Sequence, residues 1–206
     1  SVAIGGDDID KVRTDHGGLY QNITGQALPP SGTYISTESS GAGATAIGVM
    51  TTASGHFASA LGMTANASGN GAVAIGPVAK SSGEAGVAIG IASQASAKKA
   101  TAVGSVAKAT GENAIAIGTG AQATGKQSIS VGTGNVVSGA NSGAFGDPTT
   151  ISGTGSYSTG NENTITTNDT FVVGNNVTKT LDNSVFLGKD AAYTAKGAST
   201  DGNAAV

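Results

Sequence analysis

The chain has 206 residues and a net charge of −3, and only 11% of its residues are charged and 4% aromatic, whereas glycine occurs 34 times. This composition argues against a conventional globular core and an ordinary disordered chain, and four prolines are too few for a collagen triple helix. Without a dense Lys/Arg cluster we expect no nucleic-acid partner, and without cysteine neither disulfides nor thiolate metal sites can form.

The first expected strand is the run Ser-Val-Ala-Ile-Gly at residues 1–5, which lacks the charged and apolar regions of a signal peptide. Residues 6–43 then interrupt the pattern with several aspartates and the pair Pro29-Pro30. We interpret this segment as an insertion or a cap, because an open end of stacked strands must be covered. A ligand-binding loop is the alternative.

From residue 44 onward the dominant feature is a repeat of 14 residues. Turn signals such as Ser82-Gly83 and Thr124-Gly125 lie halfway between glycines in strict register: Gly48, Gly62, Gly76, Gly90, Gly104, Gly118, Gly132, Gly146, Gly160, Gly174 and Gly188. The two segments of about five residues per repeat suit strands and are too short for helices. We therefore predict an all-β solenoid in which each repeat forms one flattened coil and successive coils pair edge to edge.

Side chains alternate between the two faces of a strand, which divides each coil into inside and outside. We expect the large apolar residues near the glycine to fill the coil: Ile47, Leu61, Val73, Ile75, Val87, Ile89, Val103, Ile115, Ile117, Ile129 and Val131. The small residues between them are then expected to face other copies of the chain: Ala60, Ala74, Ala88, Ala102 and Ala116. On the second strand, alanines such as Ala121 and Ala123 face inward and Lys108 and Gln122 face water. The reverse assignment of the first strand would place the Val/Ile row outside.

Near the C-terminal end the expected outward positions become larger, at Val172 and Phe186, which indicates a change of packing partner. We divide the chain into a head at residues 1–160, last coils and a neck-like transition at 161–193, and a linker towards a stalk at 194–206. The linker is rich in Ala, Gly, Ser and Thr.

The titratable residues do not form a recognisable catalytic or metal-binding pattern. His16 and His56 lack a Ser/His/Asp arrangement, and Asp7-Asp8-Ile9-Asp10 lacks the glycine and glutamate of a calcium loop. We therefore predict no enzymatic activity, no cofactor and no bound metal.

One column of charges recurs eight residues after the glycine of successive coils, at Glu84, Lys98, Glu112 and Lys126. Stacked coils would place opposite charges side by side. We take these residues and Lys99 as candidate ligand-binding residues, with solvated side chains of little energetic value as the alternative.

The Ser-Val-Ala-Ile-Gly motif, its near-copies at 72–76 and 86–90 and the 14-residue spacing resemble the YadA-like head of trimeric autotransporter adhesins. Asn183-Ser-Val-Phe-Leu-Gly188 is similar to the neck that closes such heads. The resemblance implies a left-handed parallel β-roll, a homotrimer, and adhesion to host extracellular-matrix or cell-surface proteins. It also implies exposure on the bacterial outer membrane through a C-terminal anchor that is absent from this chain, with no other membrane contact.

Other repeat proteins remain as alternatives. A trimeric phage or virus fibre that binds a cell-surface receptor or glycan shares the solenoid architecture. A polysaccharide-cleaving solenoid would need clustered carboxylates, and an ice-binding face would need rows of threonine, whereas Thr45 and Thr101 are isolated.

Overall fold

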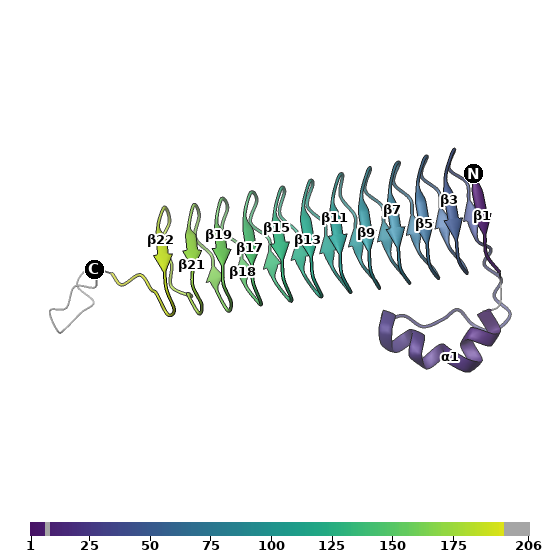
Figure 1. The fold of residues 1–206 in the computed structure, drawn as a ribbon, viewed down its shortest axis with the longest axis horizontal. Helices are drawn as coiled ribbons and strands as arrows, with labels where there is room; N and C mark the ends of the chain where they lie inside the picture. The colour runs from purple at the N-terminus through teal and green to yellow at the C-terminus, as the bar shows by residue number, and fades with distance from the viewer. Residues whose placement is uncertain (7–8, 196–206) are drawn as a thin grey trace.

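Residues 1–6 and 9–195 are described by a computed structural model, so most of the predicted linker at 194–206 lies outside the described residues. The chain forms a long roll of stacked coils, with the N-terminal strand at one end and a helix beside that end (Figure 1). Each complete coil contributes one strand of three residues and one of two residues, joined by tight turns. The predicted parallel β-solenoid is confirmed.

The two walls of the roll are parallel sheets, which we call sheet A and sheet B. Among the described residues sheet A has 12 strands, in the order β1-β3-β5-β7-β9-β11-β13-β15-β17-β19-β21-β22, and sheet B has 10, in the order β2-β4-β6-β8-β10-β12-β14-β16-β18-β20. Sheet A consists of β1 (Val2–Ile4), β3 (Thr45–Ile47), β5 (Ser59–Leu61), β7 (Val73–Ile75), β9 (Val87–Ile89), β11 (Thr101–Val103), β13 (Ile115–Ile117), β15 (Ile129–Val131), β17 (Gly143–Phe145), β19 (Tyr157–Thr159), β21 (Phe171–Val173) and β22 (Val185–Leu187). Sheet B consists of β2 (Glu38–Ser39), β4 (Thr52–Ala53), β6 (Asn66–Ala67), β8 (Lys80–Ser81), β10 (Gln94–Ala95), β12 (Lys108–Ala109), β14 (Gln122–Ala123), β16 (Val136–Val137), β18 (Thr150–Ile151) and β20 (Thr164–Ile165).

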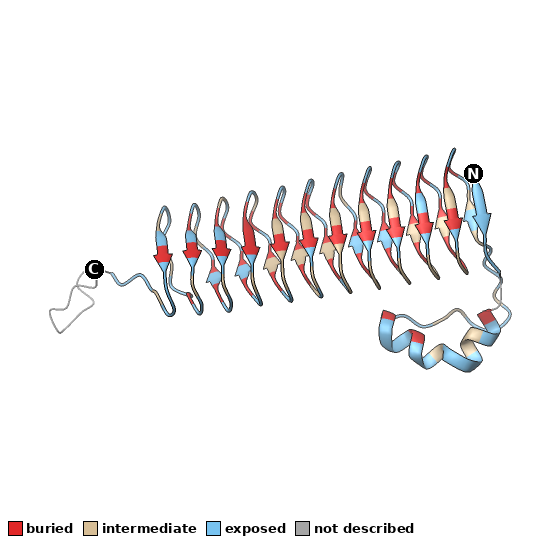
Figure 2. Ribbon diagram, in the orientation of Figure 1, coloured by how far each residue is buried: buried red, intermediate tan, exposed pale blue. Residues whose placement is uncertain are grey.

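The register of both sheets equals the sequence repeat. Ala88 pairs with Ala102 and Ala102 pairs with Ala116, each 14 residues further along. Identical positions of successive coils therefore form straight columns along the roll. In Figure 2 the buried residues recur at the same height in every coil.

The assignment of inside and outside on sheet A was wrong. The alanines predicted to face other copies lie inside the roll, and their exposed fractions are 2% or less: Ala60, Ala74, Ala88, Ala102 and Ala116. The residues predicted to fill the coil point outward and are half-buried or exposed: Ile47, Leu61, Val73, Ile75, Val87, Ile89, Val103, Ile115, Ile117, Ile129 and Val131. The predicted alternation was right and its phase was inverted.

The short circumference of the coil explains this inversion. Each interior slice is closed by two strands of two or three residues and the turns between them, so the walls lie too close for branched side chains. Ala102, Ala109 and Ala116 accordingly belong to one fully buried cluster of alanines from both walls. An interior of alanine from both walls is the one that fits.

Towards the C-terminal end the interior takes larger residues, at first where the opposite wall is small. Ile151 and Ile165 of sheet B are fully buried, and the neighbouring interior positions of sheet A are Ala144 and Ser158. Val172 and Phe186, expected outside, also lie inside, with exposed fractions of 0% and 9%. Sheet B ends at β20 while sheet A continues to β22, so the second wall is lost before the first.

The glycine column marks a turn at which successive coils approach closely. Gly104 has φ of +134°, and a Cβ atom there would lie 2.5 Å from the carbonyl oxygen of Gly118 in the next coil. A side chain at this position is therefore excluded by both the backbone conformation and the stacking distance.

Buried amides also link the coils in the C-terminal half. Asn163, 1% exposed, donates to the carbonyl oxygen of Gly174 (2.7 Å) and to Oγ of Ser158 (3.0 Å), and accepts from the backbone N–H of Val177 (2.8 Å). Asn135 donates to Gly146 and accepts from Thr149 in the same way. These amides satisfy backbone groups that the turn leaves unpaired.

The interruption at residues 6–43 contains the helix α1 (Ile9–Thr24) and leaves the first coil after Gly5. The chain rejoins the roll at Thr37, whose hydroxyl donates to the carbonyl oxygen of Gly48. Thr51 makes the same hydrogen bond to Gly62 in the next coil. The strand β2, at the end of the interruption, pairs with β4 and already belongs to the roll. The interruption is thus an enlarged turn.

The expectation that this segment covers the open strand edge was wrong. β1 and β2 remain the outermost strands, and Ala3 is exposed. Helix α1 instead lies along the side of the roll (Figure 1), where the Tyr20 hydroxyl is 3.1 Å from Oγ1 of Thr64. Arg13 holds the returning chain by donating to the carbonyl oxygens of Pro29 and Pro30.

Candidate functional site

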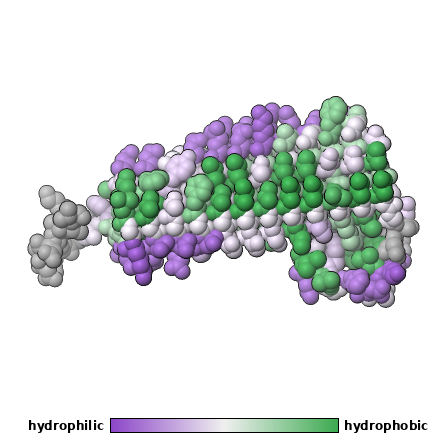
Figure 3. All heavy atoms as spheres, in the orientation of Figure 1, coloured by the Kyte–Doolittle hydropathy of each residue, from purple (hydrophilic) through white to green (hydrophobic). Residues whose placement is uncertain are grey.

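The outward side chains of sheet A form a continuous apolar surface, which we call the apolar stripe. Each coil contributes two outward side chains, except that β17 contributes only Phe145 because its other position is Gly143: Thr45 and Ile47, Ser59 and Leu61, Val73 and Ile75, Val87 and Ile89, Thr101 and Val103, Ile115 and Ile117, Ile129 and Val131, Phe145, Tyr157 and Thr159, Phe171 and Val173. Figure 3 shows a mainly green band along the roll, interrupted by a few paler side chains. Soluble monomers rarely expose a patch of this extent.

The stripe runs the whole length of sheet A. Val2 and Ile4 extend it to the N-terminal strand at exposed fractions of 50% and 59%, and Val185 and Leu187 extend it to β22 at 63% and 70%. Because the strands are in register, the side chains align in two parallel rows. This arrangement provides a flat surface on which the same side-chain positions recur in every coil, and it can pack against another flat apolar surface.

The outward face of sheet B has the opposite character. Its successive positions are Asn66, Lys80, Gln94, Lys108 and Gln122, as the sequence analysis predicted. Lys80 and Gln94 are exposed, and the other three are half-buried. The roll therefore has one apolar and one polar outer wall, separated by the alanine interior.

The predicted charge column is present as two separate ion pairs. Nζ of Lys98 lies 3.2 Å from Oε2 of Glu84, and Nζ of Lys126 lies 3.5 Å from Oε2 of Glu112. Within the described part of the chain Lys98 does not pair with Glu112, so the ladder is not continuous. All four side chains are about half exposed or more, so the pairs contribute little to stability. Their role in ligand binding, and that of Lys99, stays a prediction.

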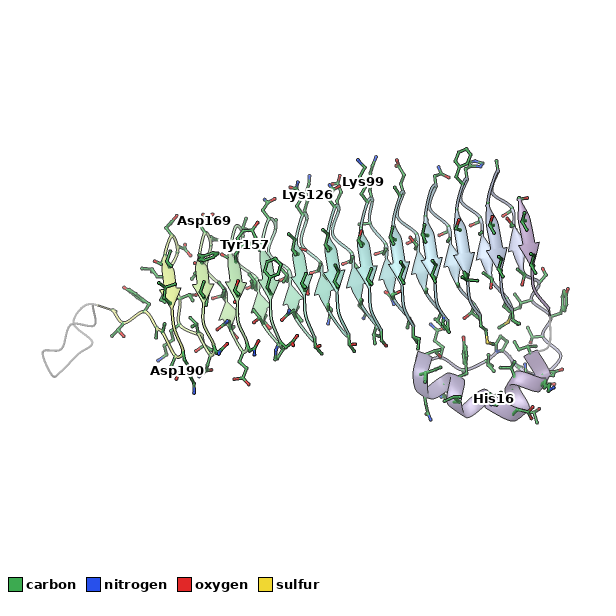
Figure 4. All side chains as sticks on the ribbon, in the orientation of Figure 1. His16, Lys99, Lys126, Tyr157, Asp169 and Asp190 are labelled. Carbon is green, nitrogen blue, oxygen red and sulfur yellow. The ribbon has the colours of Figure 1, made fainter. Side chains whose placement is uncertain are left out.

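The histidines lie on different parts of the molecule. His16 lies on α1, beside the roll (Figure 4). The candidate ligand-binding residues Lys99 and Lys126 lie at the edge of the roll opposite α1. His56 belongs to a turn of the roll, where its Nδ1 accepts from the backbone N–H of Ala42 at 3.1 Å. His56 thus has a local structural role.

The described residues, 1–6 and 9–195, form neither a metal-binding cluster nor a membrane-spanning helix. No group of three or more His, Cys, Asp or Glu side chains there is placed to hold a metal ion. No helix there has the length and apolar character needed to cross a membrane. Asp7 and Asp8 of the acidic segment lie outside the described residues.

Sequence reasoning missed α1 and the surface that α1 forms with sheet B. The signal was present in the spacing of Ile9, Tyr20 and Thr24, the buried positions of the helix, but the adjacent glycines Gly17 and Gly18 obscured it.

A comparison with protein-family models identifies a repeat in the same residues that form the coils. No curated protein matches the chain. A family model described as YadA head domain repeat (2 copies) matches overlapping stretches that together cover residues 39–147, more than half of the chain: 39–65, 58–79, 67–93, 81–107, 95–121, 109–135 and 123–147. The matched residues are those of the regular coils from β2 to β17, so the chain belongs to the YadA head family.

Proposed function

We propose that this chain is the head of a homotrimeric bacterial surface adhesin that binds host extracellular-matrix or cell-surface proteins. The observation that carries the proposal is the apolar stripe, which leaves at least one large apolar or aromatic side chain on the outer wall of every coil of sheet A. Such a surface is stable in water only when it is covered.

Other copies of the same chain are the covering that fits best. The stripe is straight and repeats every coil, and parallel copies present the same repeat in the same direction. Rotation about one axis gives a closed assembly in which every copy buries the same surface. Membership of the YadA head family supports three copies.

The remaining surfaces are then free for ligands. The polar face of sheet B and the turns at both edges would be presented three times around the axis, so weak contacts multiply. Such a head acts by binding at the surface of the bacterial outer membrane.

The test compares two pairs of lysine substitutions. Ile75→Lys with Ile117→Lys places two charges in the stripe, and Gln94→Lys with Gln122→Lys places two on sheet B. Light scattering after size-exclusion chromatography is expected to give three chains for the unmodified protein and the second pair, and fewer for the first. Loss of the trimer in neither pair, or equally in both, would contradict the proposal.

Adhesion is tested with the same proteins on immobilised collagen, fibronectin and laminin. The trimer is expected to dissociate slowly from at least one of them, and the stripe variant to dissociate at least tenfold faster, because it has lost multivalency. A trimer that binds none of these proteins and no host cells would contradict the adhesive role.

A further inference from the structure

A groove lies between the end of α1 and the polar face of sheet B, and we call it the α1 groove. Its volume is about 340 Å³, and its lining includes Thr24 and Gln26 from α1 and the following loop and Thr64, Asn66, Lys80 and Lys108 from the roll. The hydrogen bond between Tyr20 and Thr64 fixes the helix against the roll beside it. The groove exists only because the first coil carries the long insertion.

The floor of the groove is a regular polar row. Asn66 pairs with Lys80, Lys80 with Gln94 and Gln94 with Lys108, so their side chains stand on successive strands of the same outer face. Adjacent strands are ~4.8 Å apart, which places Lys80 and Lys108 ~10 Å apart with an amide between them. This alternation gives a charge, a neutral hydrogen-bonding group and a second charge along a straight line.

The groove also contains polar groups without a protein partner. In the described part of the chain Lys80 and Lys108 form no ion pair, and Oδ1 of Asn66 is buried without a hydrogen-bond donor. Buried acceptors in native proteins are normally satisfied, so the unpaired oxygen of Asn66 is an unusual feature of the groove wall. No carboxylate of the described residues lines the groove to neutralise the lysines.

We propose that the α1 groove binds a linear acidic polysaccharide in which negatively charged sugars alternate with neutral ones. Lys80 and Lys108 contact the carboxylate or sulfate groups of two charged sugars, and Gln94 bonds the hydroxyl and amide groups of the neutral sugar between them. The lining contains no aromatic side chain for a neutral sugar to stack on, so charge and hydrogen bonds determine the ligand class. The groove lies on the wall opposite the apolar stripe, and assembly through the stripe leaves it open.

This inference deepens the proposed adhesion by naming a ligand class, but it needs only a folded chain. The probe is a hyaluronan hexasaccharide, whose glucuronates alternate with neutral N-acetylated sugars, measured by isothermal titration calorimetry at low salt. The neutral hexamer of N-acetylglucosamine is the comparison ligand. The groove variant is Lys80→Gln with Lys108→Gln, and the control is Lys179→Gln with Lys189→Gln, which removes the same charge from two exposed lysines outside the groove.

We expect the unmodified protein to bind hyaluronan and not the neutral hexamer. The affinity for hyaluronan is expected to be at least about tenfold weaker in the groove variant and within about twofold of the unmodified protein in the control. Three results would overturn the inference: no binding of hyaluronan at millimolar concentration, equal binding of the neutral hexamer, or equal losses in both variants. Light scattering on the same samples reports the trimer separately, so failure of the groove and failure of the proposed assembly are distinguishable.

Discussion

The alanine interior makes an unusual prediction about which substitutions the fold tolerates. Ala116 and Ile117 are neighbours on β13; Ala116 is 0% exposed inside the roll and Ile117 is 41% exposed on the apolar stripe. Enlarging the small residue is therefore expected to destabilise the chain more than truncating the large one. In a conventional core the order is reversed, since truncating a buried isoleucine costs about 2–5 kcal/mol.

The magnitude for Ala116→Leu follows from its surroundings. Ala102 and Ser130 stand before and after it in the column, and Ala109 and Ala123 lie in the same cluster from the opposite wall, all with 0% exposure. No neighbour can yield space, so three added carbons are expected to reach the upper end of the overpacking range, about 3 kcal/mol. Ile117→Ala removes a side chain that is only half covered, for a loss of about 1 kcal/mol within one chain.

Urea unfolding at several protein concentrations separates the two effects. The loss for Ala116→Leu is expected to be independent of concentration, because it arises within each coil. The loss for Ile117→Ala is expected to grow where copies associate, because it also weakens their interface. A stable Ala116→Leu variant, together with a concentration-independent loss of several kcal/mol for Ile117→Ala, would refute the account of the interior.

Four further substitutions test other parts of the chain, each by urea unfolding. Gly104→Ala is expected to lower the free energy of unfolding by at least about 2 kcal/mol, because φ is positive there and the added Cβ would meet the backbone of Gly118. The control Gly18→Ala lies on the exposed helix with nothing within 4 Å, and it is expected to raise the free energy of unfolding by about 0.5–1 kcal/mol. Equal effects of the two substitutions would contradict the stacking argument. Asn163→Ala leaves a carbonyl and an N–H unpaired and is expected to cost about 3 kcal/mol, and a cost below about 1 kcal/mol would show that the amide does not hold the turn. Lys98→Gln is expected to change stability by less than about 0.5 kcal/mol, and a larger loss would show that the surface pair is structural.

Spacing alone was sufficient to predict the coils. The glycine register specified the strand pairing because each coil repeats the same two turns, and the paired residues are indeed 14 apart, as in Ala88 and Ala102. The outward direction of Lys108 and Gln122 followed from alternation on a strand whose inner residues are all small.

The alternation of side chains could not show which face of sheet A lies inside the roll. Both sets of side chains on β7 are apolar, with Val73 and Ile75 on one face and Ala74 on the other, so hydrophobicity did not distinguish them. The distance between the walls decides, and that distance depends on the turns of the whole coil. The α1 groove was equally hidden, because Gln26 and Lys80 are brought together by the path of the insertion and not by any repeat.

Single cysteines test the central claim most directly, since the natural chain contains none. In the Ile117→Cys variant, mild oxidation is expected to join chains in covalent pairs, because position 117 faces another copy. In the Ala116→Cys variant, the thiol is expected to react with a maleimide only after unfolding in urea, because position 116 lies inside the roll. Linked chains at position 116 with a freely labelled single chain at position 117 would contradict both the interior and the interface.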